Sequence, residues 1–220
     1  MHNSYEPGIR SKVKRAHQRG RYDYESVHAA LDCGLLCHIG YVIDGQPYVT
    51  PTLYWRKGHL LFWHGSSASR MLRRFHTPQP ACVTVTWFDG FVMARSGFHH
   101  SVNYRSVMAF GKAQLLRDKA DKNDALDALM ERVASGRLTH LRAPLEKEIK
   151  ATSVVWMEIE EASLKVRDGP PIDDEEDYDL DCWAGVLPIE ARILDPVDDP
   201  RLKAGTDVPD HISALVGKVL

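Results

Sequence analysis

The sequence lacks two features that would place the protein in a membrane or outside the cell. None of its apolar stretches approaches the ~20 residues that cross a bilayer, and the first residues, MHNSYEPGIR, contain no apolar segment typical of a secretion signal. The four cysteines, at positions 33, 37, 82 and 182, follow no paired or CxxC spacing, which is typical of reduced thiols. We therefore expect a cytoplasmic protein that does not bind membranes.

A strong net charge is also missing. The formal charge of −2 provides no overall field that would attract nucleic acid, so nucleic acid is not expected as a partner. A local basic run occupies the N-terminal residues 1–23, and we interpret it as a solvated arm or as a contact between subunits. Its cationic members are Arg10, Lys12, Lys14, Arg15, Arg19 and Arg21.

Several motifs of catalytic chemistry are absent. The sequence contains no nucleophile with an evident base, no paired carboxylates typical of hydrolases and no GxGxxG nucleotide loop. Cys33 and Cys37-His38 have the residue types of a metal site, but a strand would direct Cys37 and His38 to opposite faces. Because a closed metal site needs convergent ligands, we expect no metal here. Hydrolysis and Rossmann-type chemistry are set aside.

Three strand-like runs joined by tight turns dominate the first third of the chain. They cover residues 35–43, 46–55 and 59–64, and the first turn is Asp44-Gly45. An Asp-Gly pair between such runs is the strongest short-range signal of a β-hairpin. Pro51 removes a hydrogen-bond donor from the second run, which predicts that this strand lies at an edge, a bulge or a split.

Helix and strand signals continue through the middle of the chain. Apolar residues at helical spacing over 27–31 predict a helix that ends at Gly34, and residues 119–134 carry a second apolar helical face. A turn is expected at Asp89-Gly90. Strand patterns cover residues 81–88, 91–96, 104–116 and 151–159. About six antiparallel strands with short connections predict a barrel, because closure removes unpaired sheet edges.

A serine-rich segment, GSSASRML, follows the third strand run at residues 65–72. A helix beginning near Ser66 or Ser67 would present unpaired backbone N–H groups and a positive dipole end, and Arg70 could bond the same anion. Phosphate is the natural ligand of such a site. The alternative is that Ser66 is only an N-cap and Arg70 a solvated surface residue.

Five short motifs, taken in order, resemble those of a known family. Trp63-His64-Gly65 and Ser69-Arg70-Met71 match a Trp/Phe-His-Gly step followed by a Ser-Arg-Lys-like step, with methionine at the position that usually holds lysine. The other motifs are NYRSVMAFG at 103–111, KVRDGPP at 165–171 and WAGV at 183–186. Together they resemble the pyridoxamine 5′-phosphate oxidase-like, FMN-binding split-barrel flavoproteins, and especially the branch that includes the nitroimidazole-resistance proteins.

This resemblance implies a mainly β (α+β) fold, namely a six-stranded antiparallel split β-barrel with flanking helices. It implies FMN bound at the interface of a homodimer, and an FMN-dependent oxidoreductase that acts on a small electron-poor molecule, as a nitroreductase does. The alternative is a non-catalytic flavin- or haem-binding carrier or sensor. We expect a basic N-terminal arm over 1–23, the FMN-binding barrel over 24–167, and an acidic, proline-containing C-terminal arm with a short helix over 168–220.

The resemblance also implies the residues of the site. His64 is the predicted catalytic residue, as a hydrogen-bond partner of flavin or substrate, or as an axial ligand if haem is bound. Arg73 or Arg74 could supply the phosphate contact that Met71 lacks. The predicted cofactor-binding residues are Thr50, Pro51, Thr52, Tyr54, His64, Gly65, Ser66, Ser69, Arg70, Met71, Arg105, Ser106, Lys165 and Arg167.

The composition changes abruptly after Asp168. Two prolines and an acidic run at 173–177 precede Trp183 and a few aliphatic residues set among aspartates. An extended arm docked on the barrel or on a partner would account for these apolar residues, and a disordered acidic tail is the alternative. Asp210 followed by apolar residues at helical spacing predicts a short terminal helix.

Overall fold

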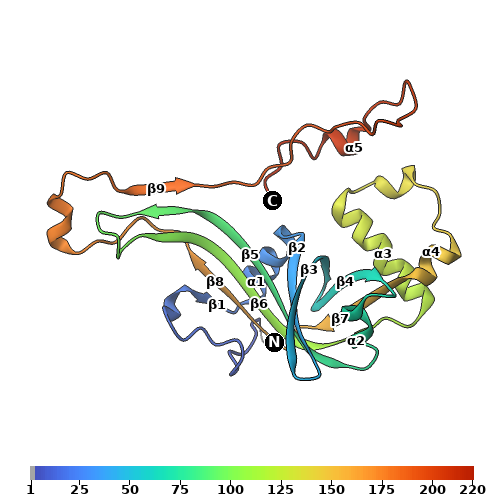
Figure 1. Ribbon diagram of the computed structural model, residues 1–220, viewed down its shortest axis with the longest axis horizontal. Helices are drawn as coiled ribbons and strands as arrows, with labels where there is room; N and C mark the ends of the chain where they lie inside the picture. The colour runs from blue at the N-terminus through green and yellow to red at the C-terminus, as the bar shows by residue number, and fades with distance from the viewer. Residues whose placement is uncertain (1–2) are drawn as a thin grey trace.

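A computed structural model of the chain describes residues 3–220 and shows a nine-stranded antiparallel sheet in that range (Figure 1). The strand order is β1-β8-β6-β7-β4-β3-β2-β5-β9, and an additional pairing of β6 with β5 closes a six-stranded ring. The ring consists of β2 (Leu36–Ile43), β3 (Gln46–Lys57), β4 (Leu60–Ser66), β5 (Gln79–Met93), β6 (Ser101–Leu115) and β7 (Thr152–Glu158). The expected six-stranded antiparallel split barrel is thus confirmed.

The first hairpin of the ring forms where the Asp-Gly pair predicts it. Asp44 and Gly45 have φ angles of 50° and 79°, as a two-residue turn of type I′ requires. The turn sets Ile43 opposite Gln46, and this register continues along both strands. β3 extends beyond the end of β2 and turns at Gly58 into β4.

Inward-facing side chains from alternate positions fill the ring. On β5, Val83 and Val85 are almost completely buried while their neighbours are partly exposed. Helix α1 (Tyr24–Cys33) adds Val27, Ala30 and Leu31 to the same core, and the short helix α2 (Arg70–Arg74) adds Met71 and Leu72. Burial of each Val or Leu side chain contributes about 1.5–3 kcal/mol, so this cluster is the main source of stability.

Gly34 follows α1 as expected, but its backbone is extended, with φ −79°. A Cβ atom at this position would lie only 2.7 Å from both Tyr54 Oη and Val85 Cγ1. The residue is therefore glycine because the end of α1 packs closely on the barrel, rather than because the helix ends in a left-handed cap.

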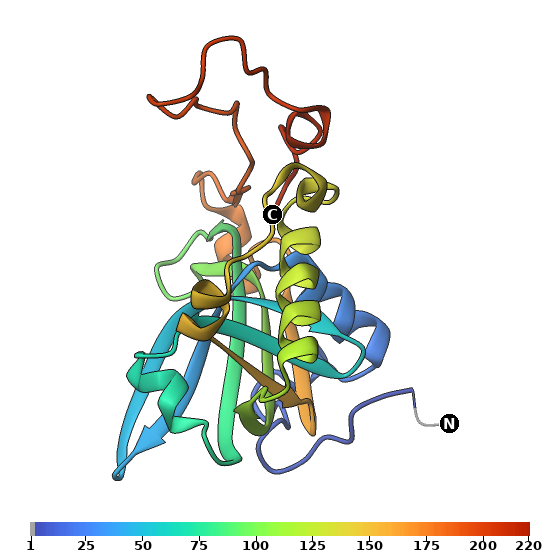
Figure 2. The same ribbon diagram turned by 90° about the vertical axis from the view of Figure 1, so that its right-hand side faces the viewer.

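Two further helices cover the outer face of β3, β4 and β7. Helix α3 (Lys119–Val133) packs Ala125 and Leu129 onto Trp55 and Phe62, which makes a second, smaller core. Figure 2 shows α3 running along one side of the barrel. The 3-10 turn η2 (Arg137–His140) and helix α4 (Glu146–Ala151) connect α3 to β7. Within residues 3–220, no helix combines the length and the hydropathy needed to span a bilayer.

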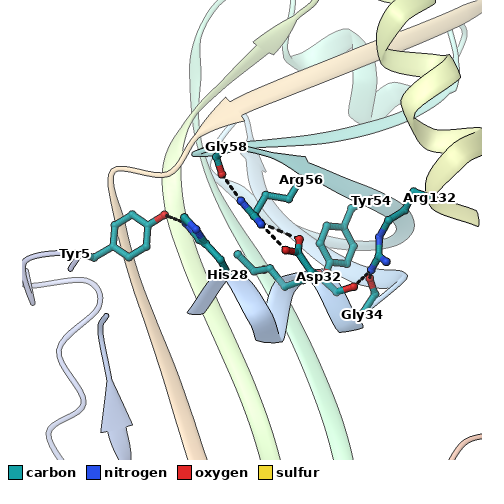
Figure 3. A network of polar contacts seen from close by, with 9 residues as sticks. Tyr5, His28, Asp32, Gly34, Tyr54, Arg56, Gly58 and Arg132 are labelled. Carbon is teal, nitrogen blue, oxygen red and sulfur yellow. Dashed lines mark hydrogen bonds and ion pairs between the residues drawn. The ribbon is translucent and has the colours of Figure 1, made fainter. Parts of the chain in front are cut away.

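The N-terminal segment is attached to the barrel rather than free. The 3-10 turn η1 (His17–Arg19) leads into β1 (Gly20–Arg21), which pairs with β8 (Glu161–Arg167) beside β6. Upstream, Tyr5 is buried, and its hydroxyl lies 2.8 Å from His28 Nε2 (Figure 3). Residues 1 and 2 of the expected N-terminal arm lie outside the described residues.

The turn expected at Asp89-Gly90 is wrong. β5 continues through this pair, and its register with β6 shifts between Phe88 and Gly90, which is a bulge. Gly90 has φ 153°, and a Cβ atom there would lie 2.6 Å from the carbonyl oxygen of Leu187 in β9. The connection between β5 and β6 lies between Met93 and Ser101.

The C-terminal region docks on the barrel through one short strand. After the 3-10 turn η3 (Glu175–Asp179), β9 (Gly185–Pro188) pairs with the outer end of β5. Asp173 anchors the preceding turn, because its buried carboxylate accepts bonds from both the backbone N–H and the guanidinium of Arg95. Beyond β9 the chain extends away from the barrel to the short helix α5 (Asp210–Ser213) (Figure 1).

Candidate functional site

The barrel opens between β3 and β4. These two strands pair only over Tyr54–Lys57 with Leu60–Trp63, and beyond that β3 pairs with β2 alone while the end of β4 pairs with β7 alone. Predicted site residues line both sides of this opening: Thr50, Pro51 and Thr52 on β3, and His64, Gly65 and Ser66 on β4. The structure therefore brings together two of the predicted segments.

The β3 side of the opening presents unpaired backbone groups. The Tyr54 N–H donates to the Leu35 carbonyl at 3.1 Å. In an antiparallel strand the N–H and C=O groups of every second residue point to the same side, so those of Tyr54, Thr52 and Thr50 face β2. Those of Val49, Pro51 and Leu53 consequently face the opening. Because proline has no N–H, this edge offers three carbonyl oxygens but only two donors. Pro51 thus lies at the split, as its position in the strand predicts.

Aromatic side chains lie beside this edge. Thr50 Oγ1 lies 3.1 Å from Tyr41 Oη, and the Tyr41 and Tyr48 rings stack with centroids 5.6 Å apart. Arg70, at the start of α2, places its guanidinium over the Tyr48 ring. The Arg70 side chain is exposed and forms no ion pair within residues 3–220. It is therefore available to an anionic ligand.

The helix expected to begin at Ser66 or Ser67 begins at Arg70 instead. Ser66 still belongs to β4, and the following turn is closed by the Ser69 N–H, which donates to the Ser66 carbonyl at 2.8 Å. The Ser66 hydroxyl accepts from the Ala68 N–H, and Ser69 is the N-cap but makes no side-chain bond to the helix. A helix of five residues has a weak dipole, so an anion here would be held mainly by Arg70.

The two other arginines of α2 have backbone partners. Arg74 Nε donates to the Val42 carbonyl at 2.7 Å, which ties α2 to the β2–β3 hairpin. Arg73 Nε donates to the Ser67 carbonyl at 3.4 Å and so braces the turn before the helix. The Nε groups of Arg73 and Arg74 are thus used to hold α2 in place, and Arg70 is the arginine of this helix that is left for a ligand.

His64 lies on β4 at the rim of the opening. It is half-buried, its Nδ1 is buried without a hydrogen-bond partner within residues 3–220, and its ring centroid lies 6.1 Å from that of Trp55. Burial lowers the pKa of His64 below its ordinary value. The imidazole is therefore neutral at neutral pH, and its unpartnered nitrogen can bond a ligand or a metal.

Three predicted cofactor contacts have structural roles instead. Tyr54 is buried in the barrel core, and its hydroxyl donates to the Leu31 carbonyl at 2.5 Å, so it fastens the end of α1 (Figure 3). Met71 is only 6% exposed and packs in the same core. Arg167 is also buried and donates to Asn103 Oδ1 and to the Gly169 carbonyl. Their side chains are already committed to packing or to internal hydrogen bonds.

Arg105, Ser106 and Lys165 lie elsewhere on the sheet, on β6 and β8. Arg105 donates to both carboxylate oxygens of Asp89 and stacks over Trp87 at 4.9 Å. Ser106 is paired with Lys165 across the two strands. One chain does not bring these residues to the opening between β3 and β4.

Tyr41 and Tyr48 were missed by the sequence reasoning. The signal was available, because a two-residue turn at Asp44-Gly45 sets these residues opposite each other. A cavity of about 750 Å³ on the other side of the barrel wall was also missed. It lies between α3, η2 and α4, and it is lined by apolar residues together with Asn123, Asp127, Arg142 and Glu148. No sequence motif marks it.

These features agree with the comparisons to known proteins. The family model described as pyridoxamine 5′-phosphate oxidase matches residues 23–166, so the chain belongs to this family. Among solved structures, the flavocytochrome Anf3 from Azotobacter vinelandii is 43% identical, with 97% of this chain and 100% of that chain covered and a TM-score of 0.91. A search of the curated proteins finds no match.

Two other solved structures define how far the similarity extends. The FAD and heme binding protein from Mycobacterium smegmatis is 36% identical, with 90% of this chain and 98% of that chain covered and a TM-score of 0.86. A protein described as a 5-nitroimidazole antibiotic resistance protein from Bacteroides thetaiotaomicron is 20% identical, with 66% and 84% covered and a TM-score of 0.53. The latter likeness supports the fold alone.

Proposed function

We propose that this protein is a flavin-dependent oxidoreductase whose flavin sits in the opening between β3 and β4. The observation that carries this proposal is that the elements bordering one opening supply an unpaired strand edge, an arginine without an ion pair and a neutral histidine with an unpartnered nitrogen. Isoalloxazine needs backbone donors and acceptors along its pyrimidine rim, and the edge over residues 49–53 offers both. The names of two relatives above 30% identity, a flavocytochrome and an FAD and heme binding protein, support flavin as the ligand.

Arg70 is the proposed phosphate contact. Its guanidinium is preoriented by stacking on Tyr48, and an arginine matches the geometry of phosphate oxygens. FMN is the flavin we expect from the sequence, whereas the name of the Mycobacterium relative favours FAD. Both flavins carry a phosphate next to the ribityl chain, so the contact to Arg70 is proposed for either. Mass spectrometry of the cofactor released by heat would distinguish FMN from FAD.

Flavin supplies the redox chemistry when bound, and the chain supplies binding and electrostatics. His64 is placed to orient a substrate or to hold a proton, because burial keeps its imidazole neutral and able to accept one. We propose a small electron-poor substrate, in keeping with the sequence. A carrier or sensor without turnover remains the alternative, and consumption of a reduced nicotinamide or another donor by the flavin-loaded protein would decide between them.

Haem is a second proposed cofactor. The cavity between α3, η2 and α4 has the volume of a cofactor pocket, and its walls include Leu126, Met130, Leu138 and Leu141, with Arg142 as a cation for a propionate. Arg142 is paired with Glu148, so it would have to exchange or share this partner. No histidine within residues 3–220 lines this cavity, so an axial imidazole such as the neutral, unpartnered one of His64 would have to come from outside its lining; haem would supply one-electron chemistry.

We also propose a homodimer with the flavin at its interface. Leu53 and Val49 of β3 and Leu36 of β2 are large exposed apolar residues beside the opening, a surface that a second copy would cover. In such a dimer Arg105, Ser106 and Lys165 of the second copy could approach the flavin.

The four cysteines are free, which supports our expectation of a reducing cytoplasmic setting.

The visible absorption spectrum of the freshly purified protein tests the proposed function directly. Flavin bands near-stoichiometric with the chain are expected, and a Soret band would add haem. Protein that contains no flavin and does not bind added FMN or FAD would refute the assignment of the opening between β3 and β4 as a flavin site.

A further inference from the structure

The C-terminal loop, residues 194–209, is held by a short ladder at its base and is left exposed by the rest of residues 3–220. Residues 191–193 and 217–220 form a short ladder, in which Leu220 N–H donates to the Ala191 carbonyl and Gly217 N–H to the Ile193 carbonyl. The backbone hydrogen bonds within residues 194–209, such as Leu202 to Asp199, are local. The ladder therefore fixes the two ends of the loop, while the loop itself does not pack on the barrel.

Two apolar side chains on this loop are largely open to solvent. Val197 is 95% exposed and Leu194 is 76% exposed. Single exposed aliphatic residues are common, but two close together on a loop held away from the barrel mark a surface used for contact. The loop is also acidic, with Asp195, Asp198, Asp199 and Asp207 against only Arg201 and Lys203.

The complementary charge lies in the N-terminal segment 10–21, which contains six cations and no acidic residue. Arg10 is paired with Glu160 and Glu161. Lys12, Lys14, Arg15 and Arg21 are exposed and form no ion pair within residues 3–220. Figures 1 and 2 place this segment and the C-terminal loop at opposite ends of the molecule, so the loop cannot reach the segment of its own chain.

We propose that the C-terminal loop docks on a second copy of the chain, with its aspartates against the partner's N-terminal segment and with Leu194 and Val197 packed on the partner's surface. Two-fold symmetry repeats the contact, so each copy both gives and receives a loop. The loop lies beyond the residues 23–166 that the family model matches. The contact is therefore proposed in addition to a dimer formed by the barrel surfaces, and it uses none of the residues assigned to the flavin site.

A charge-exchange experiment on the full chain tests this contact. One variant carries Lys14→Asp with Arg15→Asp, and the other carries Asp198→Lys with Asp199→Lys. Alone, each variant places like charges together, and with two copies of each contact we expect homodimers roughly tenfold weaker than the parent by sedimentation or mass photometry. Mixed together, the two variants should form a heterodimer of nearly parental affinity, because both contacts regain opposite charges.

The apolar part of the contact is tested by Leu194→Ser with Val197→Ser, and Ile172→Ser serves as a matched exposed control, since Ile172 is 69% exposed and lies outside the loop. The loop variant should weaken the dimer and raise protease cleavage within 194–209, whereas the control should do neither. A mixture no more dimeric than its separate components would overturn the proposal. So would an unchanged dimer in the Leu194/Val197 variant, and flavin content measured on the same samples would show separately whether the proposed function stands.

Discussion

The guanidinium carbon of Arg70 lies 4.4 Å from the centroid of the Tyr48 ring, so a cation from α2 is laid across an aromatic side chain of β3. The contact spans the opening of the barrel, and Arg74 secures the same helix to the hairpin through Val42. A cation stacked on an aromatic ring keeps its edge N–H groups free for an anion. The pair therefore fixes a cation where we propose that the flavin phosphate binds, without the help of a long helix.

Replacement of Arg70 by alanine should weaken flavin binding strongly. A hydrogen bond between charged groups contributes about 1.5–3 kcal/mol, which corresponds to a loss of roughly 10- to 150-fold in affinity. Fluorescence titration with FMN and with FAD measures the change. Arg73→Ala is the control, because Arg73 lies on the same helix but is directed to the Ser67 carbonyl. An equal loss of flavin affinity in the two variants would contradict a direct contact between Arg70 and the phosphate.

Replacement of His64 by alanine should separate the two proposed cofactors. If His64 serves the flavin or the substrate, the variant keeps its flavin bands and loses turnover. If His64 ligates haem iron, the variant loses or shifts the Soret band, because alanine cannot supply the metal bond. Spectra and turnover measured on one preparation distinguish these outcomes, and a variant unchanged in both would exclude a functional role.

Stability should fall as the pH is lowered through the range in which the half-buried His28 titrates. Burial, then Arg56 and His59, lower the pKa of His28 below its ordinary value of 6.5. The unfolded chain then binds a proton at a higher pH than the folded chain, so the free energy of unfolding is highest above pH 6.5 and declines as the pH falls toward the folded pKa.

Urea unfolding at pH 7.5 and at pH 5.5 would measure this decline. His28→Gln should reduce the decline, because glutamine does not titrate there but can still bond the Tyr5 hydroxyl. The exposed His38 provides the control variant His38→Gln. A pH dependence that is the same in all three proteins would contradict the role given to His28.

Introduction of lysine at Met71, the residue type usual in the resembled family, should destabilise this protein. Met71 is buried against the barrel core, so lysine would lose apolar packing and bring a charge into the interior, at a cost of about 2–5 kcal/mol. Met71→Leu conserves volume and should cost less than about 1.5 kcal/mol. Thermal unfolding measures both. A fully stable Met71→Lys protein would mean that the lysine reaches solvent at the opening.

Local signals in the sequence were sufficient to predict the barrel and its first hairpin, but they did not predict the course of β5. Asp44-Gly45 fixes the register of the first hairpin, and Pro51 marks the split, because turn geometry and a missing donor act over a few residues. Asp89-Gly90 has the same composition as a turn but forms a bulge. The approach of β9 to Gly90 and the long pairing of β5 with β6 depend on residues distant in the sequence.

The candidate site shows the same division. Thr50, Thr52, His64 and Arg70 come from motifs that are close in the chain and lie on elements that border one opening, and their role in binding a cofactor stays a prediction. Tyr54 has the residue type of a flavin contact, yet its hydroxyl is used by the end of α1, and Arg167 is used by Asn103. Tertiary packing decides which polar side chains form hydrogen bonds inside the protein and which stay free for a ligand. The spacing of residues in the sequence does not reveal this.

The unpaired edge of β3 has a consequence for the solubility of the protein when no ligand is bound. An exposed strand edge can pair with strands of other molecules. Because Pro51 has no backbone N–H, the hydrogen-bond ladder with such a strand would be interrupted at the middle of this edge. Pro51 therefore protects the empty opening from edge-to-edge association while leaving its carbonyl oxygens free. A flavin bound here as proposed would take the place of the absent neighbouring strand, so we expect the flavin-loaded protein to aggregate less readily than the flavin-free protein.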